Sequence, residues 1–246
     1  MRATEYEEEA RDIALDAADE EGRATFSFAP LTKPPTGLPP AWKKALTARN
    51  PTSAVLALWE PLAKTYPKTL RGLKRTLQRV GLLTTAKRGH SLVYLFELED
   101  DGGATLRRGY PPAKKFPKIA PRLAEDFLAF YAVHDGWLDE DAMMGPRRAV
   151  DWAPLGESGP SRDFLVTFEG HGPGNLGFDL SEKDAPCYTV WSSDKPERVR
   201  KVAAEIDDWM AVRMEEFIPT RAAKPAKAKT AKKAAAKRRG LARRGG

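Results

Sequence analysis

The chain of 246 residues has one cysteine, Cys187, and only three histidines. A single cysteine excludes a disulfide framework and a cysteine-based zinc site. No uninterrupted apolar run approaches the roughly 20 residues that a helix needs to cross a bilayer. The first residues also lack the basic-then-apolar order of a secretory signal. We therefore expect a soluble, cytoplasmic protein without a membrane partner.

Residues with catalytic chemistry are few and stand apart. His90, His134 and His171 are the only strong proton carriers near neutral pH, and no HExxH or similar spacing joins them. Cys187 lies in an apolar stretch, which is more typical of a small core residue than of a nucleophile. The turn sequence at 172–175 lacks the Lys-Ser/Thr of a phosphate-binding loop. We expect no catalytic residue, no metal and no cofactor.

The formal net charge of +7 conceals blocks of opposite sign. Residues 1–21 carry −7, residues 41–88 carry +10, residues 119–218 carry −10 and residues 219–246 carry +11. Because opposite charges attract, the basic blocks favour nucleic acid and the acidic block favours a basic protein partner.

Both ends of the chain are predicted to lack stable structure. Residues 1–21 have helix-forming composition but little to bury, which favours a frayed or transient helix. Residues 29–40 contain five prolines, as in an extended linker. We therefore expect residues 1–40 to be an acidic, proline-rich and mostly disordered lead. Residues 219–246 form a Lys/Ala/Arg tail that cannot fold alone, because like charges repel.

The tail has two interpretations. Its eleven positive charges without an acid predict salt-sensitive, sequence-independent binding to nucleic acid. The alternative is that it folds back over the acidic block and screens it. The tail residues expected to contact nucleic acid include Lys232, Lys233, Arg238 and Arg239.

A basic helix and a hairpin are predicted within residues 41–110. The apolar face of the helix consists of Leu70, Leu73, Leu77 and Val80. Its opposite face carries Lys68, Arg71, Arg75 and Arg79. Gly81 suits the end of this helix. Residues 91–98 alternate as a strand, and residues 104–110 can return as its antiparallel partner.

This order of elements resembles a winged helix-turn-helix. In that family the last helix enters the major groove and the hairpin contacts the DNA backbone, which would make the four basic residues nucleic-acid ligands. The alternative is a structural extension whose basic residues form a solvated helix face. Gly72 weakens the DNA-binding interpretation, because glycine inside a helix costs about 1 kcal/mol relative to alanine.

Residues 111–218 predict a helix, an acidic loop, a strand meander and a closing helix. The first helix lies within 121–137, with Pro121 near its start and Gly136 as a left-handed stop. Strands are predicted within 163–169, 175–180 and 187–191. The closing helix has an apolar face made of Val199, Val202, Ile206, Trp209, Met210 and Phe217.

At these residues the chain resembles the SUKH superfamily, which includes fungal cell-wall synthesis regulators and many bacterial immunity proteins. The resemblance rests on the order and spacing of LAEDFLAFYAVHDGW, DWAPL, FEGHGPGNLGFDL, and YTVWSSD followed by EIDDWM. It covers about 100 of the 246 residues, and the ending HDG departs mildly from the commoner Asn-Gly. It implies an α+β fold: an antiparallel meander sheet flanked by an N-terminal and a long C-terminal helix, preceded by a smaller helical-plus-hairpin segment.

The resemblance implies a non-enzymatic binding module, an immunity or sequestering protein that neutralises a basic, nuclease-like toxin or regulates a partner. The acids of residues 119–218 would attract such a basic partner. We expect the contacts to come from Asp139, Glu140, Asp141, Glu182 and Asp184, with Trp137 and Trp191 as aromatic anchors. The alternatives are that these acids are ordinary surface charge, and that the two tryptophans are core residues. A different function would be a DNA-binding transcriptional or nucleoid-associated regulator that uses residues 41–110 and the tail.

Overall fold

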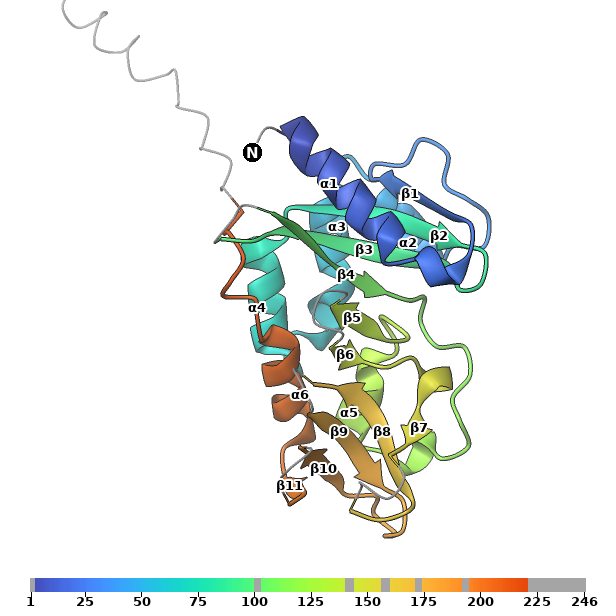
Figure 1. The fold of residues 1–246 in the computed structure, drawn as a ribbon, viewed down its shortest axis with the longest axis vertical. Helices are drawn as coiled ribbons and strands as arrows, with labels where there is room; N and C mark the ends of the chain where they lie inside the picture. Colours follow the sequence, from blue (N-terminus) through green and yellow to red (C-terminus); the bar gives the residue numbers. More distant parts are fainter. Residues whose placement is uncertain are drawn as a thin grey trace, which may run out of the picture.

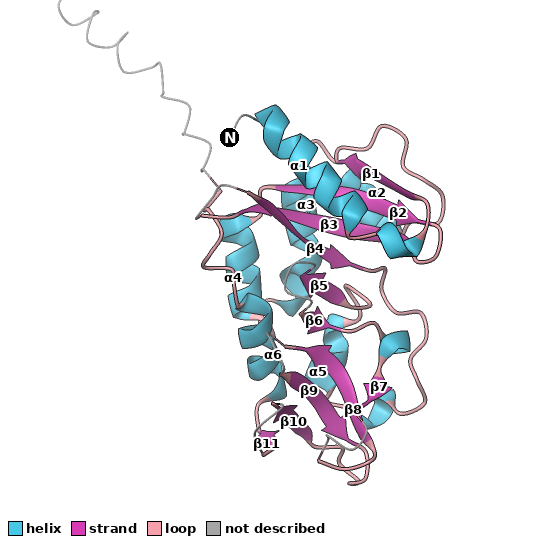
Figure 2. Cartoon of the chain, in the orientation of Figure 1, coloured by secondary structure: helices cyan, strands magenta, loops and turns pink. Residues whose placement is uncertain are grey.

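The computed structural model describes residues 3–99, 103–139, 144–155, 160–170, 174–191 and 195–220. Within these residues the chain forms six α-helices and eleven β-strands. The strands pair antiparallel and build two sheets that follow one another along the long axis of the molecule (Figure 2). The predicted mixed α+β class is confirmed.

The first sheet has five strands in the order β1–β2–β3–β4–β5. The strands are β1 (Ala24–Phe28), β2 (Arg79–Thr85), β3 (Gly89–Glu97), β4 (Ala104–Gly109) and β5 (Trp137–Asp139). Helix α1 crosses one face of this sheet, and α2 and α3 lie against the other (Figure 1). These helices are α1 (Ala3–Asp16), α2 (Pro40–Leu46) and α3 (Pro51–Trp59).

Strand β3 shows why this sheet is buried on both faces. Successive side chains of a strand point to opposite faces. Val93 and Leu95 join the apolar cluster under α1, whereas Leu92, Tyr94 and Phe96 join the cluster under α2 and α3. Strands β3 and β4 pair as the predicted hairpin. They are central strands of the sheet, however, and therefore do not form the exposed wing that a winged helix-turn-helix requires.

The second sheet has the order β11–β10–β9–β8–β6, with β7 also paired to β8. Its strands are β6 (Gly145–Pro146), β7 (Ala153–Pro154), β8 (Phe164–Glu169), β9 (Asn175–Asp179), β10 (Cys187–Val190) and β11 (Glu197–Val199). Helices α5 (Glu125–Phe130) and α6 (Val202–Ala211) pack against it. The ring of Phe127 on α5 lies 5.2 Å from that of Phe178, and the ring of Trp209 on α6 lies 5.5 Å from that of Phe168.

The two sheets share one hydrophobic core. The same cluster of buried side chains continues from α2 and α3 to α5, α6 and the second sheet. An isolated backbone bridge between Asp139 and Met144 links the sheets, with the amide of Asp139 donating to the Met144 carbonyl over 2.8 Å. Residues 41–110 and 111–218 are therefore joined by continuous packing.

Helix α4 (Pro67–Thr76) packs along α6, and the two lie on the same side of the molecule (Figure 1). Asp207 of α6 accepts hydrogen bonds from the amides of Lys68 and Thr69, each over 2.8 Å. These amides belong to the first turn of α4, where the helix itself offers no acceptor. Gly72 lets Met214 pack against α4, because a Cβ at this position would lie 2.9 Å from the Met214 Cγ. Gly72, which lowers the helix propensity of α4, therefore allows the close packing of Met214 against this helix.

Removing the Asp207 carboxylate is expected to destabilise the protein. Asp207→Ala leaves two amides of α4 without acceptors, and the loss of a cap typically costs about 1–2 kcal/mol. Asp208→Ala is the matched control, because this neighbouring carboxylate is exposed and pairs only at the surface with Lys68. Its cost is expected to stay below about 1 kcal/mol. Urea unfolding of both variants measures the difference, and equal losses would contradict the capping role.

Three predicted elements have different boundaries in the structure. Residues 3–28, expected to be mostly disordered, contain α1 and β1. The basic helix ends at Thr76, and Val80 and Gly81 belong to strand β2 instead. The closing helix α6 ends at Ala211, because the chain then turns so that Phe217 stacks on Phe96 of the first sheet at 4.6 Å. Residues 221–246 of the predicted disordered tail lie outside the described residues.

Candidate functional site

The predicted partner contacts Trp137 and Asp139 are core residues. Both lie on β5 and are 1 % exposed. Trp137 packs against Trp59 with ring centroids 5.0 Å apart. Neither can contact a partner, so their assignment to a binding surface is wrong. The acidic-loop residues Glu140 and Asp141 lie outside the described residues.

The buried carboxylate of Asp139 holds two arginines. Its Oδ2 accepts from Arg107 Nε over 3.2 Å, and its Oδ1 accepts from Arg213 Nη1 over 2.9 Å. Arg107 also donates to the carbonyls of Met210 and Val212, at the end of α6. Burial lowers the pKa of the Arg107 guanidinium, and the Asp139 carboxylate opposes this shift. The group thus fastens the end of α6 to the first sheet.

His134 belongs to a second buried network. Its Nε2 lies 2.6 Å from the hydroxyl of Tyr94, which accepts from the indole N–H of Trp59, and its Nδ1 lies 3.1 Å from the carbonyl of Tyr110. A neutral ring that carries its proton on Nδ1 satisfies every group of this chain. Burial lowers the pKa of His134 to about 3, although the hydrogen bond with the Tyr110 carbonyl raises it. The ring therefore stays neutral and is structural.

The remaining predicted partner contacts lie at or near the surface. Glu182 and Asp184 are exposed in the turn between β9 and β10. Trp191 is half-buried and lies 5.7 Å from the ring of Trp209. These three residues are available to a partner, but β9 and β10, which they adjoin, lie at the opposite end of the molecule from α1 (Figure 1).

The predicted nucleic-acid face of the basic helix is divided in the structure. Lys68 pairs with Asp208, and Arg75 donates to the carbonyl of Met214 over 2.7 Å. Arg79 lies on β2, where it pairs with Glu7. Arg71 is exposed and makes no ion pair with any described residue. The expected four-residue DNA-binding face does not form, because α6, the segment after it and α1 each bind one of its members. The tail residues Lys232, Lys233, Arg238 and Arg239 lie outside the described part of the chain.

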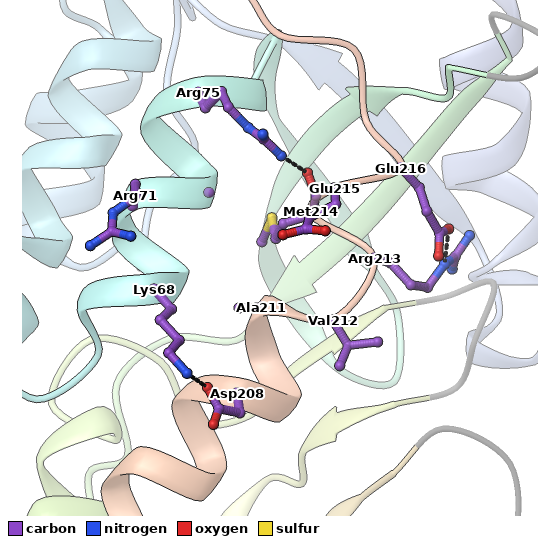
Figure 3. Close-up of a pocket in the computed structure, with 11 residues that line it drawn as sticks. Lys68, Arg71, Arg75, Asp208, Ala211, Val212, Arg213, Met214, Glu215 and Glu216 are labelled. Carbon is purple, nitrogen blue, oxygen red and sulfur yellow. Dashed lines mark hydrogen bonds and ion pairs between the residues drawn. The ribbon is translucent and has the colours of Figure 1, made fainter.

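An open groove of about 740 Å³ separates α4 from the segment that follows α6. Its walls carry charges of both signs: Figure 3 shows Lys68 joined to Asp208, and Arg213 joined to Glu216, across or beside it. Because four basic side chains and three carboxylates line this groove, it offers no strong field of one sign to a ligand.

Helix α1 carries an acidic face that the sequence analysis did not identify. Glu5, Glu8, Asp12 and Asp16 are exposed at helical spacing, and Asp19 and Glu20 extend the set. The opposite side of α1 buries Tyr6, Ala10, Ala14 and Ala18 against the first sheet. The four-residue spacing of these buried side chains was the feature of the sequence that could have predicted a stable amphipathic helix. It was missed because alanine adds little apolar area, and the sheet supplies the rest.

The charge of −10 over residues 119–218 is only partly a surface charge. Four of its carboxylates are buried, namely Asp135, Asp139, Asp179 and Asp207. Ten described carboxylates are exposed, against seven exposed basic side chains. The acids of this block are therefore less available to a partner than the sequence suggested.

The described residues hold no group of three His, Cys, Asp or Glu side chains placed to bind a metal ion. Cys187 is buried on β10, and burial raises the pKa of its thiol far above the ordinary value, which suppresses the nucleophilic thiolate. His171 lies outside the described segments. No helix among those described is long and apolar enough to span a membrane.

Comparisons with known proteins identified no relative of this chain. No family model, curated protein or solved structure matches the chain.

Proposed function

We propose that this chain is a non-enzymatic, cytoplasmic protein-binding module that captures a basic protein partner, as an immunity or sequestering protein does with a nuclease-like toxin. The observation that carries the proposal is the acidic face of α1. The four exposed carboxylates of α1, from Glu5 to Asp16, are continued by Asp19 and Glu20 on the short helix η1 (Asp19–Glu21), and Arg11 is the single base between them. The packing of α1 on the sheet presents them outward on a rigid element.

The SUKH resemblance supports the same class of function. The helix α5, the strands β8, β9 and β10 and the closing helix α6 follow the order that the resemblance implies. Helix α5 ends at Phe130 with Tyr131 as its C-cap, so Gly136 is not the predicted stop of this helix; its φ of +86° belongs to the turn that leads into β5. A nuclease must present basic surface to hold phosphate, so an acidic helix face is complementary to it.

Charge reversal on α1 tests the proposal. Glu8→Lys/Asp12→Lys is expected to slow association with a basic nuclease-type partner, such as the product of the neighbouring gene, by about tenfold or more at low salt. It is also expected to weaken protection when the two are co-expressed. Stopped-flow or surface-binding kinetics over a series of salt concentrations measures the first effect.

The matched control reverses the same number of charges at the surface that the sequence predicted. Glu182→Lys/Asp184→Lys leaves α1 intact and should leave association nearly unchanged. If the Glu182→Lys/Asp184→Lys variant associates more slowly with the partner and the α1 variant associates at the wild-type rate, the partner binds at the β9–β10 turn instead. If the wild type neither binds nor protects, the immunity proposal is wrong.

A further inference from the structure

Two adjoining grooves run along the side of the molecule that is formed by the beginnings of α4 and α6 and by β11. One has a volume of about 490 Å³ and lies between η3 (Ala120–Arg122) and β11. The other has a volume of about 760 Å³ and lies between Pro67 and the first turn of α6. They share Ala124, Arg200 and Val202, so they form one continuous depression.

Basic side chains line this depression. They are Lys64, Lys68, Arg122, Arg198, Arg200 and Lys201. Lys68 is neutralised by Asp208. Arg122 is held in place by the carbonyls of Leu180 and Glu182, which leave its charge uncompensated. The other four form no ion pair with any residue that the structure describes. We call the five uncompensated residues, all but Lys68, the groove cations.

Few carboxylates oppose the groove cations. Asp126, Asp184 and Asp207 also line the depression. Both oxygens of Asp207 already accept amide hydrogen bonds from α4. These amides are neutral and leave the charge of Asp207 in place, so five cations face three carboxylates, of which Asp126 and Asp184 are exposed. This basic surface lies mostly within the block that the sequence marks as strongly acidic, because the fold brings together scattered basic residues from three separate segments.

We propose that the groove cations bind the phosphate backbone of duplex nucleic acid without regard to sequence. The cations extend along two grooves instead of enclosing one point, which suits a row of phosphates better than a single anion. Among the described residues that line the grooves, Phe178 is the one aromatic side chain, and it is buried. Without exposed rings the site lacks the platforms on which unpaired bases stack, so a duplex is favoured over a single strand. The surface is distinct from α1 and does not depend on the proposed protein partner.

The experiment must separate this surface from the basic tail. In the full-length chain, Arg198→Glu/Arg200→Glu/Lys201→Glu reverses three groove cations. The control Lys43→Glu/Lys44→Glu/Arg49→Glu reverses three exposed bases on and after α2, outside the grooves, and changes the net charge equally. Both variants keep the tail. Fluorescence anisotropy with a short labelled DNA duplex, titrated over a series of salt concentrations, reports affinity and its salt dependence.

The groove variant is expected to lower affinity at low salt by about tenfold or more, and to reduce the slope of log K against log salt by about 3. The control is expected to retain the wild-type slope. Equal losses of affinity in both variants would show that binding depends on net charge alone. An unchanged affinity of the groove variant would show that the tail binds the duplex. Either result overturns the proposal. Arg198→Gln/Arg200→Gln/Lys201→Gln, which adds no carboxylate, should show the same direction with an unchanged circular dichroism spectrum.

Discussion

Replacing Asp139 by alanine is expected to lower the free energy of unfolding by about 3–5 kcal/mol. The change leaves the Arg107 guanidinium, which is 2 % exposed, without its carboxylate in the core. Breaking a buried ion pair on one side costs this much because the remaining charge stays desolvated and unpaired. It also releases Arg213, which holds the turn after α6. Chemical denaturation of wild type and variant at neutral pH measures the loss.

Two comparisons make this result specific. Glu182→Ala removes an exposed carboxylate of the same sequence-predicted set and is expected to change stability by less than about 0.5 kcal/mol. The double variant Arg107→Met/Asp139→Ala should lose less than the sum of the two single variants, because it leaves no unpaired guanidinium at position 107. A loss for Asp139→Ala as small as that of Glu182→Ala would mean that this pair does not support the core.

Acidification from about pH 7.5 to about pH 5 is expected to lower the free energy of unfolding by about 2 kcal/mol through His134 alone. Burial holds the pKa of the folded-state ring at about 3, whereas the unfolded chain has the ordinary value near 6.5. Below pH 6.5 the unfolded state therefore binds a proton at His134 that the folded state does not bind. The loss grows by about 1.4 kcal/mol per pH unit until the folded-state pKa is reached. This range lies above the ordinary pKa of carboxyl groups.

The histidine variants test this assignment. His134→Gln removes the titrating ring, so its stability is expected to change much less between these pH values, even if it is lower throughout. His90→Gln is the histidine control, because His90 lies half-buried at the other end of β3 beside Thr84 and Thr36, and its replacement leaves the buried network of His134 intact. An identical pH dependence in wild type and His134→Gln would show that another group titrates.

Local periodicity allowed much of the secondary structure to be predicted. The strands within 91–98, 104–110, 163–169 and 187–191 are present, because alternating apolar residues and turn residues act over a few neighbours. The end of the basic helix was misplaced. Val80 continues the helical spacing, but pairing of β2 with β1 and β3 outweighs that local preference. The order in α1 was missed because the apolar surface that stabilises it belongs to a sheet formed later in the chain.

The candidate binding residues were harder to predict, because charge type does not specify exposure. Trp137 and Asp139 precede an acidic loop in the sequence, yet β5 places them against Trp59 and Arg107. Glu182 and Asp184 share the same residue types and are exposed. The difference depends on partners that lie far away in the sequence, which a local pattern does not contain.

The sequence by itself determined the mixed α+β class, the scarcity of cysteine and histidine and the blocks of opposite charge, because composition and short-range periodicity suffice for each. Only the tertiary structure decided which charges are available. It buries four carboxylates of the acidic block, exposes those of α1 and gathers the groove cations on η3, on β11 and just before α4 and α6. Burial and juxtaposition arise from contacts between distant segments, so the sign of a stretch of chain does not fix the sign of the surface it helps to form.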